Sequence, residues 1–146
     1  MKHMSVFAVA VCLLAGVVGN GTVSAQDHAA KATIPFNFNV GNRSVPAGTY
    51  LITSSTTNPK VVVIRSQDGN IDLLSLTQED DRRSDTSKLV FTKYGDQYFL
   101  HEVLCSRCGI DVEFPDSKHE KLARKRLEAG LLSPSDVYLA LNDRKR

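Results

Sequence analysis

The amino-acid sequence predicts a mainly β domain: a small antiparallel β-barrel or sandwich of six to seven strands, with two short C-terminal helices. Three observations support this prediction. Two pairs of apolar runs are joined by Asp68-Gly69 and by Gly95-Asp96, which is the pattern of β-hairpins. Shorter segments before and after them alternate apolar and polar residues with the period of a strand. A helical pattern begins only after residue 116.

The first 25 residues have the pattern of an export signal. Lys2 precedes an apolar run over residues 6–18, and Val23-Ser24-Ala25 places small residues where a signal peptidase reads them. The apolar run is shorter than the roughly 20 residues that cross a bilayer, so no transmembrane anchor is expected in the mature chain. We therefore expect a bacterial protein that begins at Gln26 and is exported to the periplasm or the medium.

The mature chain divides into three segments. Residues 26–32 are expected to be a flexible N-terminal segment, residues 33–116 the antiparallel β domain, and residues 117–146 a basic helical tail. The β domain opens with apolar residues at alternate positions from Ile34 to Val40. Pro35 cannot donate to a ladder, so this is an edge strand or a strand that begins there. A second strand follows over residues 49–53, with Tyr50 and Ile52 on one face.

The two hairpins have predictable registers. The Asp68-Gly69 turn pairs apolar with apolar residues and Arg65 with Asp72, as cross-strand packing prefers. The other expected pairs of this hairpin are Ile64 with Leu73, Val63 with Leu74, and Val61 with Leu76. In the second hairpin Gly95 suits the first position of a type II′ turn. The expected pairs there are Phe91 with Leu100, Thr92 with Phe99, and Val90 with His101.

The second hairpin is apolar on both faces. Leu89, Phe91, Tyr98 and Leu100 are expected on one face, and Val90, Tyr94, Phe99 and Val103 on the other. A hairpin of this kind lies centrally, with a layer packed on each face.

The chain downstream of the hairpins predicts one more strand and then two helices. Residues 109–114 alternate, and Pro115 ends them. Ser117 and Glu120 form a capping box for a helix that runs to about Ala129, with Gly130 as its stop. Ser133 is expected to cap a second short helix, with Pro134 in its first turn.

Charge excludes one class of partner. The chain has 18 basic and 16 acidic residues, and no run of basic residues interleaved with aromatics, so nucleic-acid binding is not expected. The basic tail over residues 117–146 is expected to be a solvated surface, or to contact an anionic surface weakly. The charged connection over residues 78–87 is expected to be a solvated loop, and an acidic metal site within it is the less favoured interpretation.

Cys105-Ser106-Arg107-Cys108 is the one spacing with chemical meaning. In an oxidising compartment such a pair most often forms a local disulfide, which is the favoured interpretation. A redox-active dithiol would want its first cysteine at a helix N-terminus, and the pair instead follows a strand. A zinc site that adds His101 and His119 as ligands is the third alternative. We expect no resident metal and no cofactor.

Catalytic constellations are weak. No Gly-x-Ser-x-Gly elbow is present. Asp111 and Glu113 alternate on a strand and share a face, which would suit paired acid–base chemistry, but two solvated carboxylates are the commoner arrangement. No catalytic residue is therefore assigned.

Three stretches carry a family resemblance: residues 34–43 with 46–50, residues 89–100 with 102–103, and residues 114–123. Together they resemble a family of small, uncharacterised secreted proteins of acidobacterial-type soil bacteria. The resemblance implies an exported all-β domain with no assigned activity, cofactor or catalytic residue. The chain departs from that pattern in its Cys105/Cys108 pair, which stands where relatives have an aromatic residue and glycines, and in its extension beyond Ala123.

The function we expect is that of an exported, non-catalytic β domain, an envelope or secreted module that binds a small molecule, a polymer or a protein. The alternative is a thiol–disulfide redox protein that uses Cys105 and Cys108. A third hypothesis is a structural envelope component whose basic tail contacts anionic surfaces.

Overall fold

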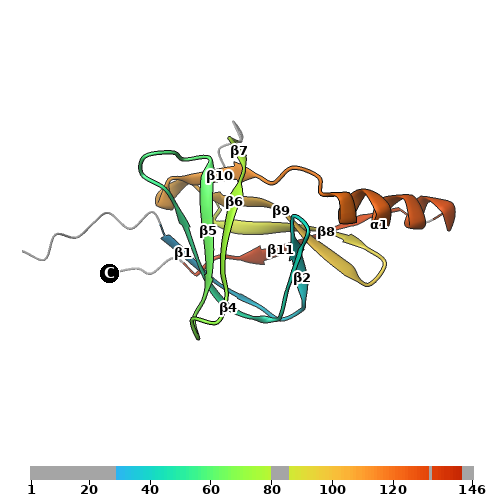
Figure 1. Ribbon diagram of the computed structural model, residues 1–146, viewed down its shortest axis with the longest axis horizontal. Helices are drawn as coiled ribbons and strands as arrows, with labels where there is room; N and C mark the ends of the chain where they lie inside the picture. Colours follow the sequence, from blue (N-terminus) through green and yellow to red (C-terminus); the bar gives the residue numbers. More distant parts are fainter. Residues whose placement is uncertain (1–28, 80–85, 132, 143–146) are drawn as a thin grey trace, which may run out of the picture.

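The computed structural model describes residues 29–79, 86–131 and 133–142, and its fold is mainly β (Figure 1). The first sheet has the order β1–β4–β5–β6, and the second β11–β8–β9–β10–β7, with β2 paired to β9 and β3 paired to β2. The strands of the first sheet are β1 (Ala29–Ile34), β4 (Gly48–Ser54), β5 (Val61–Ser66) and β6 (Asp72–Leu76). Those of the second are β2 (Phe38–Val40), β3 (Arg43–Val45), β7 (Gln78–Glu79), β8 (Lys88–Tyr94), β9 (Gln97–Cys105), β10 (Ile110–Glu113) and β11 (Ser135–Ala140).

The two sheets form layers, and strands β4–β6 cross strands β8–β10 (Figure 1). The described strands do not close into a barrel. Of the two predicted architectures, the sandwich therefore fits better than the barrel. At one corner the backbone N–H of Asn142 donates to the carbonyl of Lys31 at 2.9 Å, which ties the segment after β11 to β1.

The main hydrophobic core lies between the sheets and is joined by Phe38. Its ring packs edge-on against Tyr50 of the first sheet and against Phe91 of the second, with 5.5 Å between ring centroids in each case. All three side chains are almost fully buried. Burying a side chain of this size contributes roughly 1.5–3 kcal/mol, so this aromatic trio is a main source of the attraction between layers.

The predicted register of the first hairpin is confirmed at every position. Ile64 pairs with Leu73, and Arg65 with Asp72, whose carboxylate accepts from the guanidinium at 2.8 Å. The remaining pairs are Val63 with Leu74 and Val61 with Leu76. In the turn Gly69 has a φ of 76°, which glycine adopts at little cost.

The second hairpin differs from its prediction by one residue. Phe91 pairs with Leu100 and Thr92 with Phe99 as predicted, but Val90 pairs with Glu102 and not with His101. A register shift between Val90 and Phe91 leaves His101 as the extra residue of a bulge. The shift also moves Val103 opposite Leu89, into the main core, so its predicted face was wrong.

Both faces of this hairpin are covered, as predicted. Phe91 and Leu100 face the main core. On the opposite face Tyr94 and Phe99 form a second cluster with two residues of α1 (Lys118–Ala129), namely Ala123 and Leu127. Figure 1 shows α1 extending from one end of the second sheet.

The predicted first helix is confirmed and the second is wrong. The hydroxyl of Ser117 accepts from the backbone N–H of Glu120 at 3.0 Å, and Gly130 ends α1. Residues 135–140, expected as a helix, form β11, which pairs with β8 from Lys88 to Lys93. The open edge of β8 offers a row of unpaired backbone groups, and pairing with them outweighs the local helix-start pattern at Ser133.

Two segment boundaries also change. Residues 29–32, expected to be flexible, pair with β4 as part of β1, so the β domain begins earlier than residue 33. The segment expected as a helical tail contributes a strand to the second sheet and is part of the domain. The predicted signal over residues 1–25 lies outside the described residues. A membrane-spanning helix is not found among the described residues.

Candidate functional site

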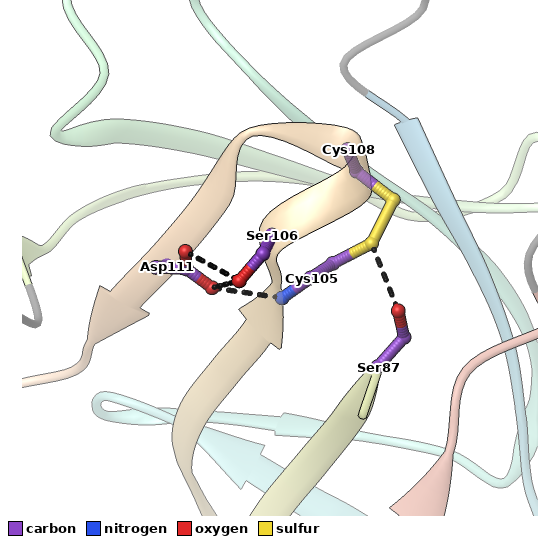
Figure 2. The surroundings of a disulfide bond; sticks show 5 residues. All are labelled: Ser87, Cys105, Ser106, Cys108 and Asp111. Atoms are coloured by element: carbon purple, nitrogen blue, oxygen red, sulfur yellow. Dashed lines mark hydrogen bonds between the residues drawn. A yellow bond between two sulfur atoms is a disulfide. The ribbon is translucent and has the colours of Figure 1, made fainter. Parts of the chain in front are cut away.

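The structure joins Cys105 and Cys108 by a disulfide, with 5.2 Å between their Cα atoms (Figure 2). Cys105 ends β9, and Cys108 closes a short 3₁₀ turn over Ser106–Cys108 that leads into β10. Gly109 follows the turn with a φ of 65°. The bridge therefore staples the connection between two neighbouring strands.

Hydrogen bonds hold the disulfide turn from both sides. Asp111 accepts from the backbone N–H of Cys105 and from the hydroxyl of Ser106, each at 3.1 Å (Figure 2). The hydroxyl of Ser87 donates to Sγ of Cys105 at 3.5 Å. Both cysteines are buried and belong to the main core. Because exchange requires access of an external thiolate to sulfur, this burial favours a structural bridge.

The other sequence candidates do not form one site with the cysteines. His119 is exposed in the first turn of α1, where its backbone N–H lies 3.4 Å from Oδ1 of Asn42. Asp111 serves the disulfide turn, whereas Glu113 lies 3.5 Å from Nε2 of His101. The proposed zinc set of two cysteines and two histidines is not assembled in the described part of the chain. Most of the acidic connection falls outside that part.

A polar cluster that sequence reasoning missed lies beneath the start of α1. It combines His101 from the β9 bulge and Tyr94 from the end of β8 with Asp116, Glu120 and Arg124 from the helical segment. Arg124 donates to Oδ2 of Asp116 at 2.6 Å and to the hydroxyl of Tyr94 at 3.3 Å. That hydroxyl is 3.4 Å from Oε1 of Glu120. The cluster therefore links the helix to the outer face of the second sheet.

Burial governs the electrostatics of this polar cluster. Burial, reinforced by the charge of Asp116, raises the pKa of the Glu120 carboxyl. Burial likewise raises the pKa of the Tyr94 phenol. The hydrogen bonds to Tyr94 and Asp116 raise the pKa of the Arg124 guanidinium and keep it charged. A carboxylate held in low dielectric at this position is stabilised by an added positive charge.

The sequence does contain a signal for the polar cluster. Glu120 and Arg124 are spaced by four residues, which places them on one face of α1, and Asp116 lies just before the helix cap at Ser117. Their meeting with His101 depends on how α1 packs against the second sheet, which no sequence pattern indicates.

A second candidate is the solvent-facing side of β5 and β6, called here the outer leucine face. It consists of Val61, Val63, Leu74 and Leu76, which form two cross-strand pairs. The exposed fractions of Leu74 and Leu76 are 69% and 67%. Strand β6 is the edge of its sheet, and no described strand pairs with its free side. The outer leucine face thus combines apolar side chains with unpaired backbone groups.

A hollow of about 520 Å³ lies between α1, the β8–β9 turn and the start of the second sheet. Asn39, Asp96 and Arg126 are among the polar residues that line it, beside the ring of Tyr98. Most of the residues that line it are polar, so it offers less apolar area than typical small-molecule sites do.

No protein-family model, no curated protein and no solved structure matches this chain. Its function has therefore to be argued from these sites.

Proposed function

We propose that this protein is an exported, non-catalytic β domain that binds a partner protein through the outer leucine face. The observation that carries the proposal is the pair of exposed leucines, Leu74 and Leu76, on an edge strand with an open side. The resemblance to small secreted β proteins and the buried disulfide support export, because such bridges persist outside the cytoplasm.

The outer leucine face has the composition of a contact surface. Removing apolar area from water contributes about 25 cal/mol per Å², so covering two exposed leucines and two valines is favourable. The exposed ion pair of Arg65 with Asp72 lies at the next position of the same hairpin face and supplies a polar border. An apolar centre with a polar rim is the usual anatomy of a protein interface.

The open edge of β6 favours a partner segment in an extended conformation. Its unpaired backbone groups match an extended segment, which would add a strand to the first sheet. Apolar side chains at alternate positions of that segment would lie over Leu74 and Leu76. The expected occupant is therefore an extended, alternately apolar segment of a different protein.

Site-specific photo-cross-linking in the native host tests this proposal. A benzoylphenylalanine at position 74 should give one discrete adduct with a second protein, and Leu76→Glu in the same chain should abolish it. The matched control places the cross-linker at Leu122, an exposed leucine of α1. An adduct composed of two copies of this chain, equal adducts at both positions, or no adduct at position 74 would contradict the proposal. The mass of the recovered chain tests export, since cleavage should leave Gln26 first.

The alternative function is a thiol–disulfide redox protein built on Cys105 and Cys108. The observation in its favour is the bridge itself, with the Ser87 hydroxyl against one sulfur. Reduction of the native protein by a glutathione buffer of cytosolic poise would support it. Resistance to that buffer supports a structural bridge.

A further inference from the structure

The polar cluster beneath α1 contains the elements of a metal-binding site. A ring nitrogen of His101 and one carboxylate oxygen each of Asp116 and Glu120 lie within 4.8 Å of one another. Protein ligands bind zinc at about 2.0–2.2 Å, so small side-chain movements would bring the three atoms around one ion. Among the described residues, this is the one group of three such side chains that lies so close together.

The histidine is oriented for ligation by a fourth side chain. Nε2 of His101 lies 3.5 Å from a carboxylate oxygen of Glu113. A proton on Nε2 that points to Glu113 leaves the lone pair on Nδ1. Among the described residues, Nδ1 is a buried side-chain nitrogen without a hydrogen-bond partner. Metal-binding histidines characteristically donate their other N–H to a carboxylate, and Glu113 lies where it could take that role for Nε2 of His101.

The carboxylates also retain binding capacity. Glu120 is 4% exposed, and its Oε1 accepts from the Tyr94 hydroxyl at 3.4 Å, so Oε2 can take another ligand. Asp116 uses Oδ2 for Arg124, which leaves Oδ1 for another partner. Arg124 brings one positive charge to a group that holds two carboxylates, and a divalent cation would compensate the remainder. His101 and Asp116 are half-buried, so an ion can enter from solvent.

We propose that His101, Asp116 and Glu120 bind one divalent transition-metal ion of the zinc class. Imidazole favours zinc-like ions over Mg²⁺ and Ca²⁺, which prefer oxygen ligands alone. The three ligands come from the β9 bulge, the segment before α1 and the first turn of α1, so the ion fastens the helix to the second sheet. This site is independent of the outer leucine face and of the cysteines.

Titration of untagged, chelator-treated protein with Zn²⁺ tests the proposal, with a chromophoric chelator as competitor. One Zn²⁺ should bind per chain, and Glu120→Gln or Asp116→Asn should weaken binding at least about 100-fold. Glu113→Gln, which changes only the positioning residue, should weaken it about 10–100-fold. His119→Gln is the matched control, because His119 is an exposed histidine of the same helix, and should leave the affinity unchanged.

X-ray absorption of the wild-type zinc complex keeps the test independent of how the variants fold. Nitrogen and oxygen neighbours without sulfur are expected, and circular dichroism of each variant should match that of the wild type. Sulfur neighbours would overturn the proposal, because they would move the ion to the cysteines. Absence of saturable Zn²⁺ binding, or its loss in His119→Gln, would overturn it equally.

Discussion

The two sheets of this protein share one core but differ in what covers their other faces. The first sheet turns Tyr50 and Ile52 inward and leaves Leu74 and Leu76 in solvent. The second sheet is packed on both sides, against the main core and against α1. The polar cluster lies on the face of the second sheet that α1 covers. The outer leucine face is the uncovered side of the first sheet. Covering one sheet with a helix thus creates a sheltered polar site, and leaving the other uncovered creates a surface for a partner.

Charged side chains are exposed on the outer face of the first sheet and buried between the second sheet and α1. On the bare face, Arg65 and Asp72 pair in solvent, where such pairs contribute little to stability. Beneath α1, Glu120 is buried, and burial raises its pKa. A buried carboxylate needs a nearby positive charge or hydrogen-bond donors to offset its loss of hydration. Glu120 can therefore attract a cation, whereas the solvated Asp72 has no such need.

The largest effect is expected where the two sheets meet. Phe38→Ala should lower the free energy of unfolding by about 3–5 kcal/mol, because it removes the ring between Tyr50 and Phe91 and leaves a cavity. Urea denaturation measures the change. Tyr138→Ala, at a largely exposed aromatic residue of β11, is the control and should cost far less. Equal losses would show that Phe38 does not join the layers.

Removing the disulfide should have the next largest effect. The double variant Cys105→Ala/Cys108→Ala should lose about 2 kcal/mol, the entropy expected for a short closed loop. Thermal and urea unfolding of the oxidised wild type and the double variant give the difference. Ser87→Ala, which removes only the hydroxyl against Cys105, should cost much less. A stability unaffected by loss of the bridge would contradict its structural role.

The cap of α1 tests the cover of the second sheet. Ser117→Ala should cost about 1 kcal/mol, because the N–H of Glu120 loses its acceptor. Ser133→Ala is the matched control, because the sequence predicts a cap there and the structure has a strand instead. Its effect should be within about 0.5 kcal/mol, as at other exposed positions. Equal losses at the two serines would indicate that Ser133 also caps a helix, which would contradict the strand that the structure places after it.

The smallest effect on stability is expected on the bare face. Leu74→Thr should change the free energy of unfolding by no more than about 0.5 kcal/mol, because the side chain is exposed. Its neighbour Leu73 is buried in the main core, and Leu73→Ala should cost about 2–5 kcal/mol. Denaturation of both variants in parallel makes the comparison. A large loss at Leu74 would mean that this leucine serves the fold rather than a partner.

Local patterns predicted the hairpins and the first helix well. The register of β5 with β6 follows from a turn pair and from matching apolar residues, all within a short stretch of chain. The N-terminus of α1 follows from Ser117 and Glu120. Both depend on interactions between residues close in sequence, which a single sequence displays.

The errors concern interactions between distant segments. The segment after Ser133 has the start pattern of a helix, yet it pairs with β8, whose open edge is visible only in the folded chain. The bulge at His101 shifts the register of β9, and hairpin patterning cannot show an extra residue. The docking of α1 on this face brings Asp116 and Glu120 beside His101, and a single sequence does not show where a helix packs on a sheet.

By itself, then, the sequence determines the mainly β class, both hairpins, the capped helix and the proximity of Cys105 and Cys108, because each depends on neighbouring residues. Only the tertiary structure decides that residues 135–140 form a strand, that one sheet face stays bare, and that His101, Asp116 and Glu120 meet. The physical reason is that pairing with a sheet edge and burial of charge depend on surfaces that form only when distant segments pack together.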